Sequence, residues 1–261
     1  MRATLTFLGT GTSMGVPTLG CRCAVCCSSD PRNRRTRTSL KLQYGDSTVV
    51  IDTGPDFHAQ AIREDVHHLD AVLYTHGHAD HVLGFDDLRP LSFQAEGSLP
   101  IYCDEPTAET LERIFDYTFR KAGRYPTSAR VALQRIPKEP GVPFTVCGVP
   151  FFRVPVTHGW QQITGYRFGR VAYLTDMSDI PEASVPLLTG LDILILDALR
   201  REPHPSHSHL EKSLAFVEQL KPQRAYFTHM SHDLDHAETE ATLPEHIRLA
   251  YDGLQLEFEI E

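Results

Sequence analysis

The chain has 261 residues, of which 41% are hydrophobic and 23% are charged, so it can bury the core of one domain or of two small ones. No apolar run approaches the roughly 20 residues that cross a bilayer, and residues 1–9 have the pattern of a short strand rather than of a signal peptide. We therefore expect a cytoplasmic protein without a membrane partner. The formal charge of −9 argues against a general nucleic-acid binder, which needs a basic face, but leaves small phosphorylated substrates open.

Short apolar runs bounded by Gly, Pro or Asp predict a strand-rich chain with a few helices. In chain order, the predicted strands cover 4–8, 39–44, 48–51, 71–75, 144–156, 163–175, 192–197, 224–228 and 254–260. Helical spacing predicts helices over 107–119 and 209–220, the second stopped by Pro222. Because no fixed-period repeat or low-complexity linker separates these elements, we expect one layered α/β domain over 1–261, with insertions at about 15–38 and about 104–141.

Several features of the sequence have a structural rather than a functional interpretation. The glycines of residues 9–15 superficially match a phosphate-binding loop, but Pro17 and a group of cysteines stand where the helix of a dinucleotide fold would begin, so we interpret the segment as a tight turn. The basic run 30–37 could meet phosphates, and we interpret it instead as a solvated charge run. Cys103 and Cys147 lie on apolar runs, and we expect both to be small buried residues.

A dense cluster of potential metal ligands follows the predicted strand at 71–75. It consists of His76, His78, Asp80 and His81, on a loop that leaves the carboxyl end of the strand, where α/β folds commonly place their chemistry. Alternation puts His76 and His78 on one side, where they can hold one ion, while Asp80 and His81 can turn towards a second. The sequence therefore predicts a centre for two metal ions.

Three later positions repeat one pattern, a polar ligand at the end of a predicted strand. They are His158, Asp176 and His229, and each would project from the same edge of the sheets. With the motif at 76–81, their order resembles that of the metallo-β-lactamase-fold hydrolases over nearly the whole chain. The resemblance implies an αββα sandwich with the metals at one edge. It also implies the ligand sets: His76, His78 and His158 for one ion; Asp80, His81 and His229 for the other; and Asp176 as the bridge.

Imidazole and carboxylate ligands in this combination suit Zn, Mn or Fe. Besides its place in the ligand set, Asp80 is expected to be a catalytic residue. Asp52 ends another predicted strand. The resemblance implies that it supports the ligand shell, in keeping with the rule that a ligating histidine donates its second N–H to an outer carboxylate. The alternative, a turn residue before Thr53 and Gly54, stays open.

A second group of ligands lies in the first insertion. Cys21, Cys23 and Cys26 offer three thiolates to one tetrahedral ion, and His232 is the candidate for the fourth ligand. The segment resembles that of the phosphoribosyl 1,2-cyclic phosphate phosphodiesterase branch of the superfamily, in which a structural zinc is completed by a histidine in this place. A closed shell of this kind leaves no open position for substrate. Cys27 has no assigned role.

The same branch implies a histidine general acid ahead of the helix at 209–220. His207 aligns best with it, and His204 and His209 are rivals. A histidine is suited to this role because its pKa lies near working pH, and proton donation of this kind is typically worth about 10²–10⁴ in rate. A surface histidine without a role is the alternative for each of the three.

These features lead to one functional hypothesis, a dinuclear metal-dependent phosphodiesterase. A hydroxide that bridges the two ions would attack the phosphorus of a small phosphodiester, with cyclic diesters among the candidates. The alternatives are a tRNA 3′-processing endonuclease and a non-hydrolytic metal-binding cofactor-pathway protein on the same fold; a β-lactamase is disfavoured, and thiolester hydrolysis stays open. The resemblance alone indicates a homodimer.

Overall fold

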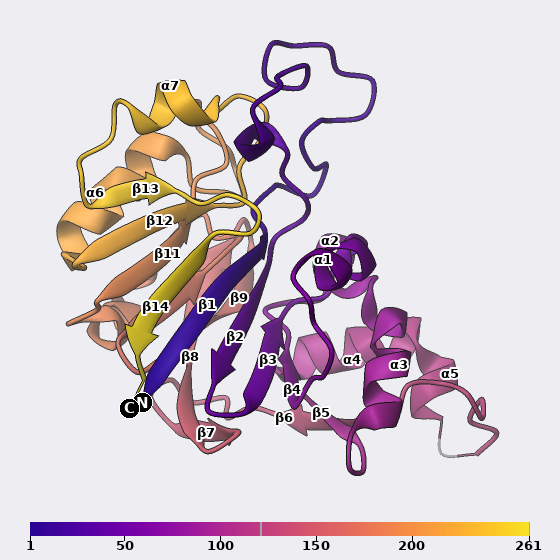
Figure 1. Ribbon diagram of the computed structural model, residues 1–261. Coiled ribbons are helices and arrows are strands. Elements are labelled where there is room, and N and C mark those ends of the chain that lie inside the picture. The colour runs from indigo at the N-terminus through magenta and orange to yellow at the C-terminus, as the bar shows by residue number, and fades with distance from the viewer. Residues whose placement is uncertain (121, 261) are drawn as a thin grey trace.

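Two sheets of seven strands each pack face to face, with helices on their outer faces (Figure 1). The structure is a computed structural model that describes residues 1–120 and 122–260. It confirms the predicted αββα sandwich. None of the helices over these residues has the length and apolarity to cross a membrane. The first sheet has the order β14 (Gln255–Glu259), β1 (Arg2–Gly9), β2 (Ser39–Tyr44), β3 (Ser47–Ile51), β4 (Ala71–Leu73), β5 (Leu99–Cys103) and β6 (Val131–Arg135).

The second sheet lies behind the first and mirrors its mixed pattern of parallel and antiparallel pairs. Its order is β13 (Ile247–Leu249), β12 (Arg224–Thr228), β11 (Ile193–Asp197), β10 (Val171–Leu174), β9 (Gln161–Phe168), β8 (Val149–His158) and β7 (Pro143–Val146). The helices are α1 (Phe57–Arg63), α2 (Ala79–Val82), α3 (Leu88–Gln94), α4 (Glu105–Ile114), α5 (Asp116–Phe119), α6 (Leu210–Leu220) and α7 (His236–Glu240), with 3₁₀ turns η1 (Pro31–Asn33), η2 (Phe85–Asp87) and η3 (Glu182–Leu188).

Strand β11 shows how the apolar runs build this layered core. Ile193 and Ile195 point into the cluster between the two sheets, whereas Leu194 and Leu196 belong to the cluster under α6. Successive side chains alternate between the faces of a strand, and both faces are covered here, so the run is continuously hydrophobic. Strands of this kind hold the loops at their carboxyl ends in fixed positions.

Turns divide two of the predicted strands and one predicted helix. The run 144–156 is the hairpin β7–β8, whose turn contains Cys147 (φ 48°) and Gly148 (φ 84°). Cys147 is exposed, so the expectation that it is buried was wrong, because it lies in this turn rather than in a strand; Cys103 is buried as expected. The run 163–175 is likewise the pair β9 and β10, and Phe115 separates α4 from α5.

The basic run 30–37 is only partly solvated, and here the sequence-based expectation was wrong for one residue. Arg35 is 1% exposed, and its guanidinium donates hydrogen bonds to the carbonyl oxygens of Ser231 at 2.8 Å and Leu234 at 2.7 Å. A buried guanidinium is tolerated when its N–H groups find acceptors. Arg35 thereby ties the first insertion to the segment that carries His232.

Candidate metal centre and active site

The structure brings all seven predicted ligands of the dinuclear site together at one edge of the two sheets. His76 and His78 lie on the loop after β4, and α2 follows with Asp80 and His81. The other ligands lie at the ends of β8, β10 and β12. Two of the groups whose ligand atoms lie within 4.8 Å of one another consist entirely of these predicted ligands: His76, His78 and His158; and Asp80, His81, Asp176 and His229.

Three residues of this edge adopt left-handed backbone conformations just beyond the ends of their strands. They are Asp52 (φ 64°), Asp176 (φ 54°) and His229 (φ 57°). A non-glycine residue in this region costs roughly 1–2 kcal/mol, and such strain persists where the surrounding contacts enforce it. The turn after each strand therefore directs these side chains into the site at some expense of stability.

Buried histidine nitrogens without partners show that the site fits metal ions. Nε2 of His76, His81 and His229 is buried and has no hydrogen-bond partner among the described residues, and an unsatisfied buried polar atom costs roughly 1–3 kcal/mol. These atoms lie 3.9, 3.2 and 3.2 Å, respectively, from Oδ2 of Asp176. Cations coordinated between them and the carboxylate would satisfy all three nitrogens.

The charges of the site also call for a cation. Burial lowers the pKa of His76 well below its ordinary value, which keeps this imidazole in the neutral form that binds metal. Burial opposes the charge of Asp176, but His229 and His81 hold the pKa of that carboxyl well below its usual range. Burial likewise opposes a charge on His81, yet the carboxylates of Asp176, Asp80 and Asp52 raise the pKa of His81 well above its ordinary value. The carboxylates are thus held ionised by neighbouring positive charge, which bound metal ions can also supply.

Asp52 contacts a ligand candidate directly, as the resemblance implies. Its Oδ2 accepts a hydrogen bond from Nδ1 of His81 at 2.8 Å, and Thr75 donates to the same carboxylate from its N–H and its hydroxyl, both at 2.8 Å. His158 is oriented in the same way, because its Nδ1 donates to the carbonyl oxygen of Ser206 at 2.8 Å. In both histidines Nε2 is left to face the site.

Of the three candidate proton donors, His207 lies at the centre. Its ring stacks on that of His229, with centroids 4.7 Å apart, and it shares a ligand group with His158 and Asp176. His204 lies beside it, with ring centroids 5.1 Å apart, and His209 occupies the N-cap position of α6. Burial lowers the pKa of His207 from its ordinary value.

Asp197 is a residue of the site that the sequence analysis missed. It is the last residue of β11, fully buried, and its Oδ2 lies 2.7 Å from Nδ1 of His207. Burial raises the pKa of Asp197 well above its ordinary value. Asp197 ends the predicted strand at 192–197, and a polar residue at the end of a predicted strand is the signal that identified Asp176 and His229. The sequence therefore contained the signal for Asp197 as well.

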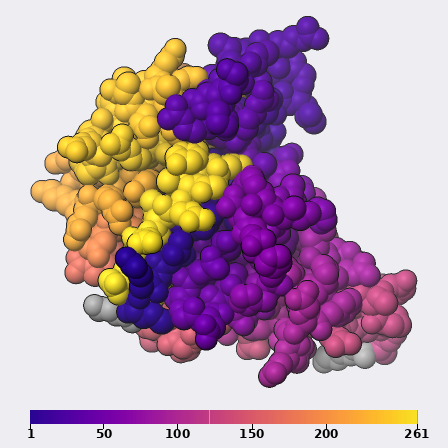
Figure 2. Space-filling model, viewed as in Figure 1, coloured from indigo at the N-terminus to yellow at the C-terminus, as the bar shows by residue number. Residues whose placement is uncertain are grey.

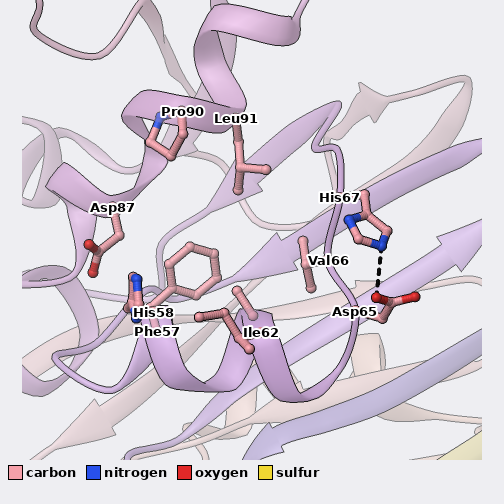
Figure 3. A pocket seen from close by; sticks show the side chains of 10 residues that line it. Phe57, His58, Ile62, Asp65, Val66, His67, Asp87, Pro90 and Leu91 are labelled. Carbon is pink, nitrogen blue, oxygen red and sulfur yellow. Dashed lines mark ion pairs between the residues drawn. The ribbon is translucent and has the colours of Figure 1, made fainter.

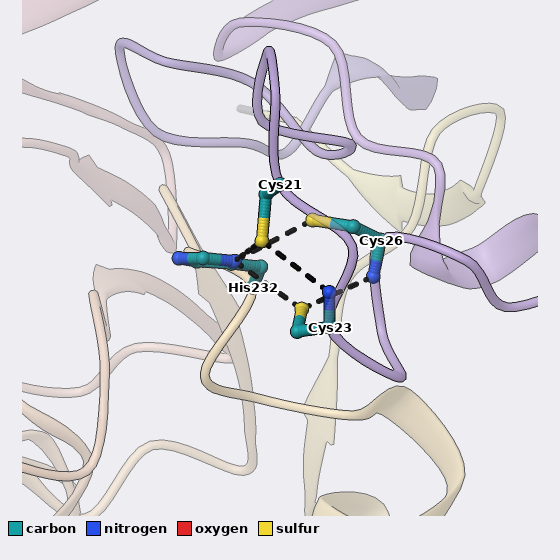
Figure 4. Close-up of side chains that lie close together, drawn as sticks. All are labelled: Cys21, Cys23, Cys26 and His232. Carbon is teal, nitrogen blue, oxygen red and sulfur yellow. Dashed lines mark hydrogen bonds between the residues drawn. The ribbon is translucent and has the colours of Figure 1, made fainter.

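The three cysteines of the first insertion surround His232 (Figure 4). The Sγ atoms of Cys21, Cys23 and Cys26 lie 3.2, 3.4 and 3.4 Å from Nδ1 of His232, close to the roughly 3.5 Å edge of a tetrahedral zinc shell. The N–H of Cys26 donates to Cys23 and lowers the pKa of that thiol to about 6, which favours the thiolate that binds metal, whereas burial raises the pKa of the Cys26 thiol to about 11. Figure 2 shows this insertion projecting from the rest of the molecule, beside the C-terminal part.

Two surface hollows adjoin the proposed metal centre, and a third does not. One of about 250 Å³ is lined by His76 and His78, and one of about 240 Å³ by His204, His207 and His232. The third, of about 340 Å³, lies between α1 and α3 (Figure 3) and contains no member of the ligand groups. Substrate access is therefore best sought at the first two.

Comparison with known proteins agrees with this geometry. Residues 47–230 match the family model of the beta-lactamase superfamily domain. The crystal structure of a new diphosphatase from the PhnP family is 53% identical in sequence, with a TM-score of 0.93 over 100% of this chain and 98% of that one.

Two curated relatives have other names. An octanoyltransferase from Porphyromonas gingivalis is 38% identical over 251 residues, 95% of this chain and 50% of that protein. The chain thus spans about half the length of that relative. Coenzyme PQQ synthesis protein B from Methylorubrum extorquens is 28% identical, over 73% of this chain and 71% of that protein. The match to the family model spans the predicted ligands from His76 to His229. By its fold and by that match, the chain belongs to the beta-lactamase superfamily.

Proposed function

We propose that the protein is a metal-dependent phosphodiesterase with a dinuclear centre and a structural zinc. The observation that carries this proposal is the convergence of two ligand groups on buried histidine nitrogens that find no hydrogen-bond partner within residues 1–120 and 122–260. The 53% identical diphosphatase supports phosphorus chemistry in particular. Because of the name of that relative, diphosphate bonds belong among the substrates to test beside simple and cyclic phosphodiesters.

In this proposal, His76, His78 and His158 would hold one ion, Asp80, His81 and His229 would hold the other, and Asp176 would be available to both. When bound, the ions would neutralise charge on the phosphoryl oxygens and lower the pKa of a water molecule.

The chain's own groups orient the reaction. Asp197 holds Nδ1 of His207, so that in the protonated form of the ring the Nε2–H can give its proton to the departing oxygen and leave a neutral imidazole. Asp52 fixes His81 in the same manner.

The test is hydrolysis of bis(p-nitrophenyl) phosphate by protein loaded with Zn, Mn or Fe. His76→Ala and Asp176→Ala should each abolish activity, because each removes a ligand. Cys147→Ser is the matched control, since Cys147 is exposed and belongs to neither ligand group, and it should retain activity. Activity that survives both ligand substitutions would contradict the proposal.

One second candidate is supported by a relative, a non-hydrolytic role in a cofactor pathway like that indicated by the name coenzyme PQQ synthesis protein B. Metal-loaded protein that turns over no phosphodiester, diphosphate or thiolester would favour that candidate. Salt-sensitive binding of tRNA would instead favour the processing nuclease, because affinity that depends on phosphate contacts falls with salt.

A further inference from the structure

A hollow of about 730 Å³ lies beside the start of α4, and we call it the proline hollow because four prolines line it: Pro106, Pro140, Pro155 and Pro181. Its lining also includes the apolar side chains of Ile136 and Ala183. The two hollows at the metal centre are much smaller, at about 250 and 240 Å³. Sites for small organic ligands typically have volumes of roughly 300–1,000 Å³ and a mainly apolar lining. The proline hollow has both properties.

Hydrogen bonds between its walls give the proline hollow a fixed shape. The walls come from the second insertion, from β8 and from η3. The hydroxyl of Ser184 in η3 donates to the carbonyl oxygen of Pro155 in β8 at 2.6 Å. The guanidinium of Arg153 in β8 donates to the carbonyl oxygen of Lys138 in the insertion at 3.1 Å. Because the prolines also have a fixed φ, the hollow is preorganised for a ligand.

The charged side chains of the lining do not call for an ionic ligand. Nε of Arg135 lies 2.8 Å from Oε2 of Glu105, and Nη2 of Arg153 lies 3.9 Å from Oδ2 of Asp104. Both arginines thus have a carboxylate of this same lining as partner, and Lys138 is exposed to solvent. The apolar side chains therefore decide what the hollow binds, and they favour a neutral apolar group.

The proline hollow adjoins the metal centre through the hollow beside His76 and His78. These two hollows share three lining residues, Asp104, Pro106 and Gln162. A molecule whose phosphorus lies at the metal centre can therefore reach the proline hollow by way of the hollow beside His76 and His78.

A phosphodiester has two ester groups, and the hollows give each of them a place. In the proposed function the group beside His207 leaves, so the retained group lies towards His76 and His78. We propose that the proline hollow binds an extended alkyl group carried by this retained ester arm. The inference rests on the proposed function and narrows the substrate class to phosphodiesters with one long apolar arm. Ala183 then occupies a specificity-determining position.

Substrates that differ only in the retained arm test this inference. They are methyl, butyl and octyl p-nitrophenyl phosphate, which have the same leaving group. We expect wild-type kcat/KM to rise about threefold for each methylene that the hollow encloses, and three or more enclosed methylenes then favour the octyl ester over the methyl ester at least about 30-fold.

Two changes at Ala183 should remove this preference for different reasons. Ala183→Trp fills the hollow, and Ala183→Asp places a charge in its apolar wall, so each should reduce the octyl-to-methyl ratio to less than about threefold. Glu182→Trp is the matched control, because it adds the same bulk at the neighbouring exposed position, which does not line the hollow. It should keep the wild-type ratio.

Binding gives a readout that does not depend on turnover. Calorimetry on metal-loaded protein should show octylphosphonate binding at least about 30-fold more tightly than methylphosphonate, with the difference lost in Ala183→Trp. If the wild type has neither chain-length preference, or if both preferences persist in the two Ala183 variants, the inference is overturned. A protein that hydrolyses none of the esters but keeps the Ala183-dependent binding preference would contradict the proposed function alone.

Discussion

The carboxylate of Asp197 lies 2.7 Å from Nδ1 of His207, and this contact fixes the orientation of the imidazole at the centre of the site. A general acid needs such fixing, because the proton has to point at the leaving oxygen. We predict that His207→Ala lowers kcat about 100-fold for a phosphodiester with an alkyl leaving group, and that Asp197→Asn lowers it about tenfold. For a p-nitrophenyl ester, which leaves without protonation, both losses should be much smaller.

The comparison of leaving groups separates proton donation from damage to the site. Asp197 also lies 3.9 Å from Nδ1 of His229, so metal content has to be measured in both variants and should match that of the wild type. His209→Ala, at the start of α6, is the control and should leave kcat unchanged. Equal losses on the alkyl and p-nitrophenyl esters in His207→Ala would rule out the role as general acid.

Most of the site could be predicted because its ligands follow apolar runs that are strands under any interpretation. His76, Asp176 and His229 each come directly after such a run, so their placement at one sheet edge followed from the fold class. Asp197 carries the same signal, but no second ligand-type residue accompanies it nearby to draw attention to β11. Its partner His207 lies ten residues further on, a spacing that only the folded loop explains.

The elements that escaped prediction have mixed or interrupted patterns. Strand β5 contains Pro100, which lacks an N–H group and argues against a paired strand, and β6 is only partly buried. Strand β13 has only three residues, from Ile247 to Leu249. The turn that exposes Cys147 was hidden inside an apolar run, although Gly148 beside it is a turn signal.

Asp52 offers a test of the outer shell of the metal centre. Asp52→Asn keeps the shape of the side chain but removes the negative charge that accepts the hydrogen bond of His81. We expect metal affinity to fall about 10–100-fold, the usual cost of losing such a partner, as measured by competition with a chelator. Asp46→Asn, in the exposed turn before β3, should leave affinity unchanged, and an unchanged affinity in Asp52→Asn would show that this carboxylate is only a turn residue.

The cysteine cluster predicts a metal count. Elemental analysis of purified protein should give about three equivalents per chain, including zinc, and Cys26→Ser should lose one of them and lower the melting temperature, because a structural zinc contributes folding free energy. Cys27→Ser changes the neighbouring cysteine, which is exposed and belongs to no ligand group, and should keep all three. One equivalent in the wild type would contradict the arrangement of two ions at the dinuclear site and one at the cysteine cluster.

Asp235 predicts a pH dependence of stability away from the metal centre. It caps α7 by accepting the N–H of Glu238 at 3.0 Å, and it accepts Nδ2 of Asn33 at 2.8 Å. The hydrogen bond from Glu238, together with that from Asn33, lowers the pKa of Asp235 below its ordinary value. A carboxyl whose pKa is lower in the folded state stabilises the protein above its unfolded pKa, about 3.9, and this contribution is lost as the pH falls through the folded value.

We therefore expect Asp235→Ala to reduce the free energy of unfolding by about 1 kcal/mol at pH 7, with the difference from wild type narrowing below about pH 4. Urea unfolding of both proteins at a series of pH values measures this difference. Both proteins contain the same metal ligands, so the contribution of these ligands to the pH dependence cancels in the difference. Asp235→Asn retains a capping side chain that does not titrate, so relative to Asp235→Ala its stability advantage should stay constant with pH. If the difference between wild type and Asp235→Ala also stays constant down to pH 2, the stabilisation by Asp235 does not depend on its charge.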